Sequence, residues 1–135
     1  TIAENIAAIR ARIDAAARLS GRTGADITLV AATKMNDAAR VREAVAAGID
    51  ACGENRVQEM TEKLAEGAYT GAPLHFIGHL QTNKVRQVVG KVDLIQSVDS
   101  PELLAYIIDM PFDESTLDIY LQNGRVTGTD RTLEH

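Results

Sequence analysis

The sequence predicts an α/β fold of parallel strand–helix units, the arrangement found in TIM-type barrels. Short apolar runs alternate with amphipathic segments of helical period, and capping or turn residues separate them. The alternation repeats about every 20–25 residues, and it favours a parallel sheet with right-handed crossovers. Four such units make about half a barrel, because a complete barrel needs about 250 residues. An open, doubly wound sheet is the alternative. The predicted strands are residues 27–33, 49–52, 74–77 and 92–98.

Residues 1–20 are expected to form an amphipathic helix before the first strand. Thr1 and Glu4 have the spacing of a capping box, and Gly21 is a plausible stop. Apolar residues recur at steps of three and four along one face, namely Ile2, Ile6, Ile9, Ile13 and Ala17. Since this helix precedes the first strand, we expect it to pack outside the sheet.

The first predicted strand, residues 27–33, is an almost unbroken apolar run, which is typical of a strand buried on both faces. Asn36 can cap the next helix, which Gly48 closes. Helices are likewise predicted over residues 56–67 and 83–89, and Ser100-Pro101 opens a last one.

The pattern changes after residue 108, so we divide the chain into a partial barrel domain, 1–108, and a divergent tail, 109–135. Residues 117–121 could form a strand, Asn123-Gly124 is a hairpin turn signal, and residues 125–127 could form the return strand. Residues 133–135 resemble the junction to a cloned affinity tag and are excluded from the fold prediction.

The composition is that of a globular protein, with 45% hydrophobic and 24% charged residues in a chain of 135. A net charge of −5 gives no general attraction to nucleic acid or to an anionic membrane. Cys52 is the only cysteine, so no intramolecular disulfide can form, which fits a reducing cytosol. No apolar stretch is long enough to span a membrane and no signal peptide is visible, and we therefore expect a cytoplasmic protein.

Lys34 ends the most apolar predicted strand and is the first candidate for chemistry. Ligands gather at the carboxyl ends of strands in parallel α/β sheets. A partly desolvated lysine there favours its neutral amine, which can attack an aldehyde to form a Schiff base. The alternative is a solvated lysine at a strand end.

Two further candidates follow the second and third predicted strands. Asn55 comes after Gly53 and could hydrogen-bond to a bound ring, or it could belong to an ordinary strand–helix turn. His79 comes after Gly78 and could orient a ligand or transfer a proton, or it could be a structural histidine. Glu59 is expected to serve ordinary helix electrostatics. The sequence shows no spacing typical of a metal site.

Four segments in order resemble the pyridoxal phosphate homeostasis protein family, whose fold is similar to the N-terminal barrel of alanine racemase. They are residues 29–34, 53–59, 75–84 and 97–100. The resemblance implies pyridoxal 5′-phosphate held as a Schiff base on Lys34, with Asn55 beside the cofactor and His79 lining the same mouth. Met35-Asn36-Asp37 stands where the family often has a proline-containing turn. The tail matches none of the later strands on which the family carries its phosphate grip.

Three functions remain open at this point. The first is a carrier of pyridoxal phosphate in intracellular homeostasis, with little catalysis of its own. The second is an amino-acid racemase, which would need a proton-transfer group opposite Lys34. The third is a ligand-free half-barrel with open edges: two copies could close into a complete barrel as a homodimer, or the tail hairpin could cover an edge.

Overall fold

The computed structural model describes residues 1–109, 118–120, 125–127 and 133–134. A seven-stranded sheet runs through them in chain order. Strands β1 to β5 pair in parallel, whereas β5, β6 and β7 pair antiparallel. The predicted parallel α/β fold is confirmed. The strands are β1 (Val30–Ala32), β2 (Ala51–Glu54), β3 (Leu74–Phe76), β4 (Leu94–Ile95), β5 (Asp118–Tyr120), β6 (Arg125–Thr127) and β7 (Leu133–Glu134).

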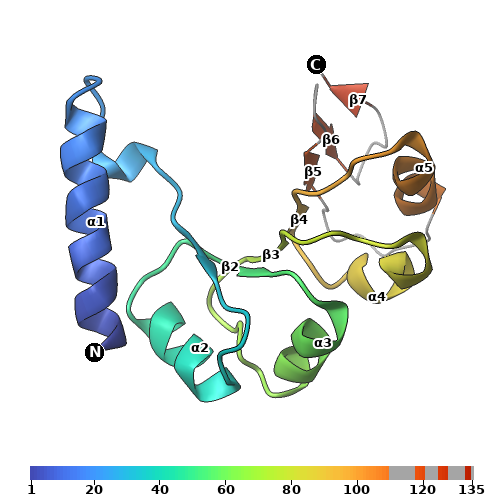
Figure 1. The fold of residues 1–135 in the computed structure, drawn as a ribbon, viewed down its shortest axis with the longest axis horizontal. Coiled ribbons are helices and arrows are strands. Elements are labelled where there is room, and N and C mark those ends of the chain that lie inside the picture. The colour runs from blue at the N-terminus through green and yellow to red at the C-terminus, as the bar shows by residue number, and fades with distance from the viewer. Residues whose placement is uncertain (110–117, 121–124, 128–132, 135) are drawn as a thin grey trace.

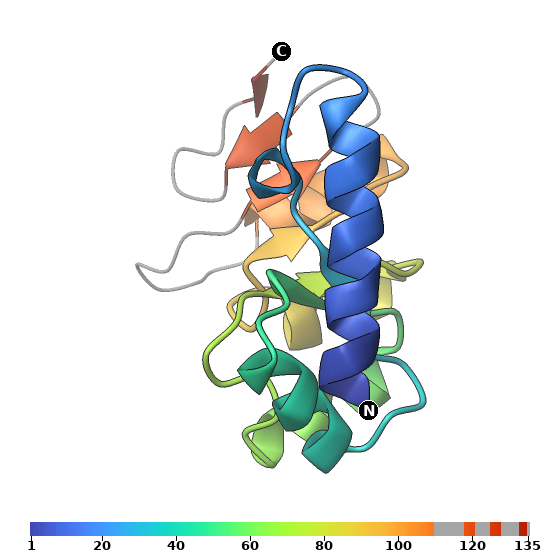
Figure 2. The same cartoon turned by 90° about the vertical axis from the view of Figure 1, so that its left-hand side faces the viewer.

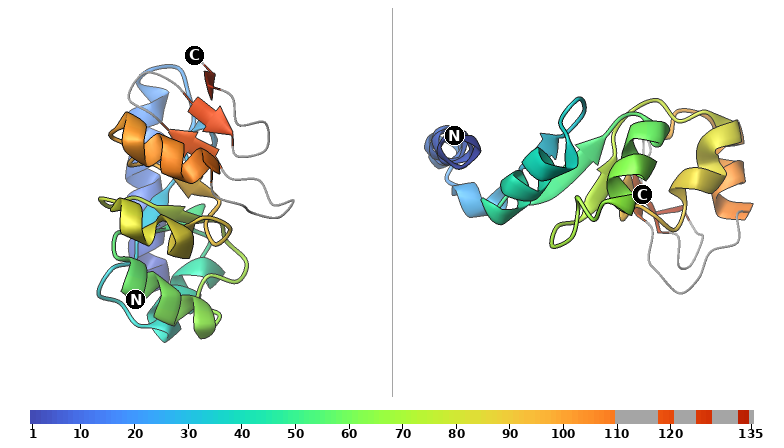
Figure 3. Two further views of the ribbon diagram at one scale, coloured as in Figure 1. Left: turned by 90° about the vertical axis from the view of Figure 1, so that its right-hand side faces the viewer. Right: turned by 90° about the horizontal axis from the view of Figure 1, so that it is seen from below.

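The helices after the strands all lie on the outer side of a curving sheet, as Figure 1 shows. Viewed from below in Figure 3, they follow one another in chain order along the sheet. The curved arrangement in Figure 1 is that of part of a TIM-type barrel. The helical elements are α1 (Ile2–Arg18), η1 (Gly24–Asp26), α2 (Ala38–Ala46), α3 (Val57–Ala65), η2 (Thr82–Lys84), α4 (Val85–Val88) and α5 (Pro101–Asp109).

Helix α1 stands at the β1 end of the sheet, outside the series of strand–helix units (Figure 2). The predicted capping box between Thr1 and Glu4 is present. Arg10 ties α1 to the rest of the fold, because it donates a hydrogen bond to the carbonyl of Gly48 and lies 3.3 Å from the Asp50 carboxylate. Asp50 also accepts a hydrogen bond from the Leu29 amide at 2.6 Å, and this bond contributes most to lowering the pKa of Asp50.

The core fills the layer between the sheet and helices α2 to α5. Cys52 is fully buried, as expected for a small core residue. The largest apolar side chains with almost no exposure are Phe76, Met60, Leu80, Ile95, Leu103 and Ile107. Together with Val41 of α2 and Cys52 of β2 they belong to one cluster, so one continuous core fixes the strand ends relative to one another.

Two predictions about the first unit are wrong. Strand β1 is not buried on both faces: Val30 and Ala31 are half-buried and Ala32 is exposed. The reason is its position, since β1 pairs only with β2 among the described residues and is an edge strand. The N-cap of α2 is Asp37, whose side chain accepts from the Arg40 amide at 2.9 Å, and not Asn36.

The predicted strand pair in the tail is confirmed. β5 lies beside β4, and β6 returns antiparallel to β5, with Ile119 opposite Val126. The turn residues Asn123 and Gly124 lie outside the described residues. β7 lies within residues 133–135, which were excluded from the fold prediction, and it pairs antiparallel with β6. The division at residue 108 stays a prediction. In the described part of the chain, no helix is both long enough and apolar enough to cross a membrane.

Candidate functional site

A hollow of about 150 Å³ lies where β1, β2 and β3 end. Its lining residues are Ala32, Lys34, Gly53, Asn55, Ile77 and Gly78. The structure therefore brings Lys34 and Asn55 together, although 20 residues separate them in the chain. This is the edge of a parallel sheet at which ligands are expected.

Lys34 sits in a tight turn after β1. Met35, the next residue, has a φ of 62°, in the left-handed region that residues other than glycine rarely adopt. The Lys34 carbonyl accepts a hydrogen bond from the Asn36 side-chain amide at 3.0 Å. The expectation that the Lys34 ammonium would be partly desolvated is wrong for this structure, because the residue is exposed.

The approach of β2 to β3 beside the hollow is too close for any side chain at position 78. A Cβ on Gly78 would lie 2.5 Å from the Asn55 Cβ and carbonyl oxygen. The Asn55 side-chain oxygen is buried and has no hydrogen-bond partner among the described residues. An unpaired buried acceptor is costly, and a polar ligand group in the hollow would relieve that cost.

His79 lies at the same edge of the sheet but is not among the residues that line the hollow. Its imidazole is 70% exposed, and Nδ1 lies 3.6 Å from the Asp99 carboxylate, beyond the end of β4. Ser100, next to Asp99, accepts a hydrogen bond from the Leu103 amide at 3.1 Å, as predicted for a helix cap. No cluster of three or more metal-binding side chains is found in the part of the chain that the structure describes.

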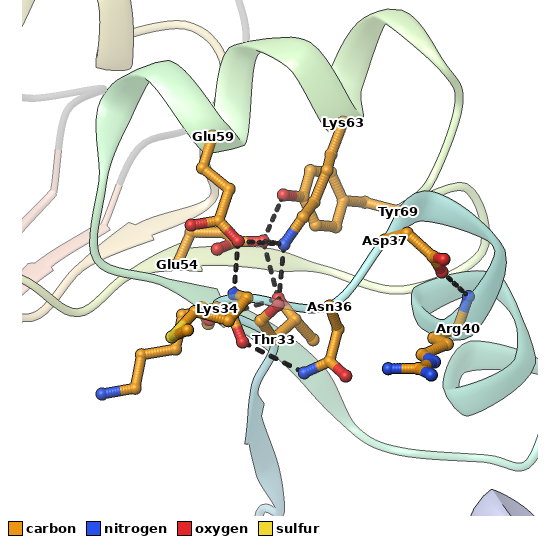
Figure 4. A network of polar contacts seen from close by, with 11 residues as sticks. Thr33, Lys34, Asn36, Asp37, Arg40, Glu54, Glu59, Lys63 and Tyr69 are labelled. Carbon is orange, nitrogen blue, oxygen red and sulfur yellow. Dashed lines mark hydrogen bonds and ion pairs between the residues drawn. The ribbon is translucent and has the colours of Figure 1, made fainter.

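A buried polar cluster next to Lys34 was not predicted (Figure 4). At its centre is the Glu54 carboxylate, which is fully buried. Oε2 of Glu54 accepts hydrogen bonds from the Thr33 hydroxyl at 2.7 Å, Lys63 Nζ at 2.8 Å and the Tyr69 hydroxyl at 2.5 Å. Lys63 also contacts the Glu59 carboxylate at 2.8 Å, so the role assigned to Glu59 in ordinary helix electrostatics is incomplete.

The charges in this cluster stabilise one another. Burial alone would lower the pKa of Lys63, but hydrogen bonds to Glu54 and Glu59 outweigh it and raise that pKa. The hydrogen bond from Lys63 is the main reason why the pKa of Glu59 is lowered. Burial, followed by the hydrogen bond to Glu54, raises the pKa of Tyr69 well above its usual range. At neutral pH Lys63 is therefore an ammonium ion, Glu59 a carboxylate and Tyr69 a neutral phenol.

A larger hollow of about 400 Å³ lies between α1, β1 and α2. Apolar residues such as Ile2, Ile6 and Val41 line much of it, together with Asn36 and Arg40. Lys34 and Asn55 do not line it, and it lies beside the edge strand, away from the ends of β2 and β3. The smaller hollow is the better candidate site, because three strand ends and an unpaired buried amide oxygen meet there.

Proteins of one kind share much of this sequence, although no family model matches the chain. The chain is 48% identical over 99 residues to the pyridoxal phosphate homeostasis protein of Pseudomonas aeruginosa, covering 73% of the chain and 43% of that protein. It is 38% identical over 125 residues to the protein of the same name from Escherichia coli, covering 90% of the chain and 53% of that protein. The chain is a homologue of the pyridoxal phosphate homeostasis proteins. It spans about half the length of the curated relatives it matches.

Solved structures of proteins with a similar sequence have the same fold. PipY of Synechococcus elongatus, whose structures with and without PLP are known, is 38% identical with a TM-score of 0.67. That match covers 79% of this chain and 46% of PipY. A protein from Bifidobacterium adolescentis, also 38% identical, has a TM-score of 0.71 over 78% of this chain and 47% of its own. The resemblance to these proteins that was found in the sequence is thus confirmed, and so is the fold.

Proposed function

We propose that this chain binds pyridoxal 5′-phosphate and serves intracellular homeostasis of that cofactor, with Lys34 as the attachment point. The observation that carries the proposal is the meeting of Lys34 and Asn55 in one hollow at the strand ends. The homologous fold of PipY, solved with PLP bound, supports the choice of ligand.

The chemistry proposed for Lys34 is a reversible condensation. The neutral amine of Lys34 would form a C=N bond to the aldehyde carbon of the cofactor, and the aldehyde oxygen would leave as water. The bound cofactor would supply an electron-withdrawing ring, and the protein would supply attachment and orientation. The turn after β1 presents the Lys34 side chain away from the buried cluster in Figure 4, so its amine is accessible to an aldehyde from solvent.

The described residues fit one part of such a ligand. The hollow of about 150 Å³ is smaller than the roughly 300–1,000 Å³ of typical small-molecule sites. We therefore assign to it the reactive end of the cofactor, with the Asn55 amide as a polar contact beside the ring. His79, exposed and next to Asp99, would flank the site from the β4 side.

The proposal is tested by trapping the adduct. The protein is incubated with pyridoxal phosphate, reduced with borohydride, and digested for peptide mapping by mass spectrometry. We expect the label on Lys34, and its loss in Lys34→Arg, while the matched variant Lys91→Arg at another exposed lysine keeps it. Equal labelling of the exposed lysines, or unchanged total labelling in Lys34→Arg, would contradict the proposal.

We further propose that the partners of this chain are the cofactor and a second copy of the chain, and not nucleic acid. The free edge of β1 in the described sheet offers unpaired backbone groups to another strand. The net charge of −5 disfavours nucleic acid. Sedimentation equilibrium should show a dimer, and a monomer at all concentrations tested would contradict the pairing.

A further inference from the structure

We propose that Glu59 and Lys63 of α3 are positioning residues for Lys34, because they hold the turn that carries it from both sides. This inference rests on the proposed function and extends it to two residues outside the hollow. Neither residue lines the hollow, so each acts through the backbone next to Lys34.

The contacts that carry the inference are made to the two peptide groups on either side of Lys34. Lys63 Nζ donates a hydrogen bond to the Thr33 carbonyl at 2.7 Å, just before Lys34. The Glu59 carboxylate accepts one from the Met35 amide at 2.5 Å, just after it. The two side chains are joined by their own ion pair at 2.8 Å. A single ion pair on α3 therefore hydrogen-bonds to the backbone both before and after Lys34.

The turn needs these hydrogen bonds because its backbone conformation is unfavourable. Met35 has a φ of 62°, and strain of this kind persists only where surrounding contacts enforce it. Its side chain is 86% exposed, so packing cannot supply the restraint. The hydrogen bond from the Met35 amide to Glu59 supplies a restraint on Met35 itself, in addition to the bonds that Asn36 donates to the Thr33 and Lys34 carbonyls. Without it, the residue would relax toward ordinary φ values and re-aim the Lys34 side chain.

The ion pair of Glu59 and Lys63 is also joined to β2, the strand that leads to Asn55. Lys63 pairs with Glu54 at 2.8 Å, and Glu54 immediately precedes Asn55 at the end of β2. Glu54, the last residue of β2, faces the cluster, whereas the next residue, Asn55, lines the hollow. The position of Lys34 is thereby fixed relative to Asn55. A site that holds its ligand through both residues requires this.

The experiment compares three variants of the whole chain. Glu59→Ala removes the acceptor for the Met35 amide, and Glu59→Gln keeps an oxygen there without the charge. Glu62→Ala, an exposed glutamate on the same helix, is the matched control. Two quantities are measured: hydrogen exchange of the Met35 amide by NMR without ligand, and the initial rate of borohydride-trapped pyridoxal phosphate on Lys34 relative to Lys91.

We expect Glu59→Ala to speed exchange of the Met35 amide by about tenfold or more. The relative labelling of Lys34 should fall by about 10- to 100-fold, the usual effect of misplacing a reacting group. Glu59→Gln should recover most of both values, which a loss of overall stability would not explain. Glu62→Ala should match the unaltered protein.

The inference is overturned if the Met35 amide is unaffected in Glu59→Ala, or if that amide is freed while labelling of Lys34 stays the same. If the unaltered protein takes no label on Lys34, the proposed function fails. The exchange measurement still decides whether Glu59 restrains the turn in that case, because it requires no cofactor. The two failures therefore give different results.

Discussion

Replacing Gly78 by alanine tests the geometry on which the candidate site depends. Gly78 follows β3 and packs against the backbone of Asn55 at the end of β2. A Cβ at position 78 would meet the Asn55 Cβ at 2.5 Å, its carbonyl oxygen at 2.5 Å and its Cα at 2.6 Å. Ordinary van der Waals contacts begin at 3.4 Å, so the two strand ends must separate by almost 1 Å.

The cost follows from which atoms clash. All three are close to or in the backbone, so no side-chain rotation can relieve the overlap. Overpacking of this kind typically costs about 1–3 kcal/mol, and we expect about 2–3 kcal/mol because the strands themselves must move. For a chain of this length each kcal/mol lowers the Tm by about 3–5 °C, so Gly78→Ala should melt about 6–15 °C lower.

Thermal unfolding followed by circular dichroism measures this, with two other glycines as references. Gly90→Ala adds a methyl group in open space and costs only the strain of its φ of 84°, roughly 1 kcal/mol. Gly53→Ala should fall between the two, because its nearest contact, 2.8 Å to Ile77 Cδ1, is the flexible end of a side chain. A Tm for Gly78→Ala at or above that of Gly90→Ala would refute the close approach of β2 and β3.

Three further predictions concern the buried cluster and the core. Tyr69→Phe removes the hydrogen bond to Glu54 and should cost about 1.5–3 kcal/mol in urea unfolding, whereas exposed Tyr106→Phe should cost almost nothing, and equal costs would count against the cluster. Because the pKa values of Lys63 and Tyr69 are raised on folding, their contribution is complete below a pH of about 10 and is lost above it. The urea midpoint should therefore drop as the pH rises past about 10, and a flat profile there would contradict this. Burial raises the pKa of Cys52 to about 11, so a thiol reagent at neutral pH should modify it only after denaturant is added, and rapid labelling of the folded protein would show otherwise.

The sequence was sufficient for the order and type of the α-helices and of strands β1 to β6, but not for their lengths, and it missed β7. The apolar run at residues 92–98 marks a strand, yet only Leu94–Ile95 pairs as β4. Composition shows which residues tolerate a strand, whereas pairing with neighbours decides where it starts and ends. The same limit explains the error at β1. An apolar run of that kind is typical of a fully buried strand, and nothing local reveals that β1 lies at an edge.

The residues of the candidate site were also only partly predictable from the sequence. Lys34 and Asn55 could be found because each follows an apolar run, and parallel strand ends meet at one edge. The cluster of Glu54, Lys63 and Tyr69 could not, because its members come from a strand, a helix and a loop. One signal was present: Glu59 and Lys63 have the i, i+4 spacing of a helical ion pair. That spacing usually marks an exposed pair, and only the packing of α3 on β2 shows that Lys63 is buried.

The burial of the ion pair between Glu54 and Lys63 indicates that this pair serves the site. Buried ion pairs are weak contributors to stability, since desolvation offsets most of their attraction, and apolar replacements are often as stable. Stability alone therefore gives little reason to place Glu54 and Lys63 inside the core. Their location does explain a different property. Both Glu54 and Lys63 hydrogen-bond to Thr33, which immediately precedes Lys34, and Glu54 immediately precedes Asn55. The pair therefore joins the two residues that come just before Lys34 and Asn55 of the hollow. An apolar core could cover these strand ends equally well, but it could not hydrogen-bond the Thr33 carbonyl and so fix the turn that carries Lys34.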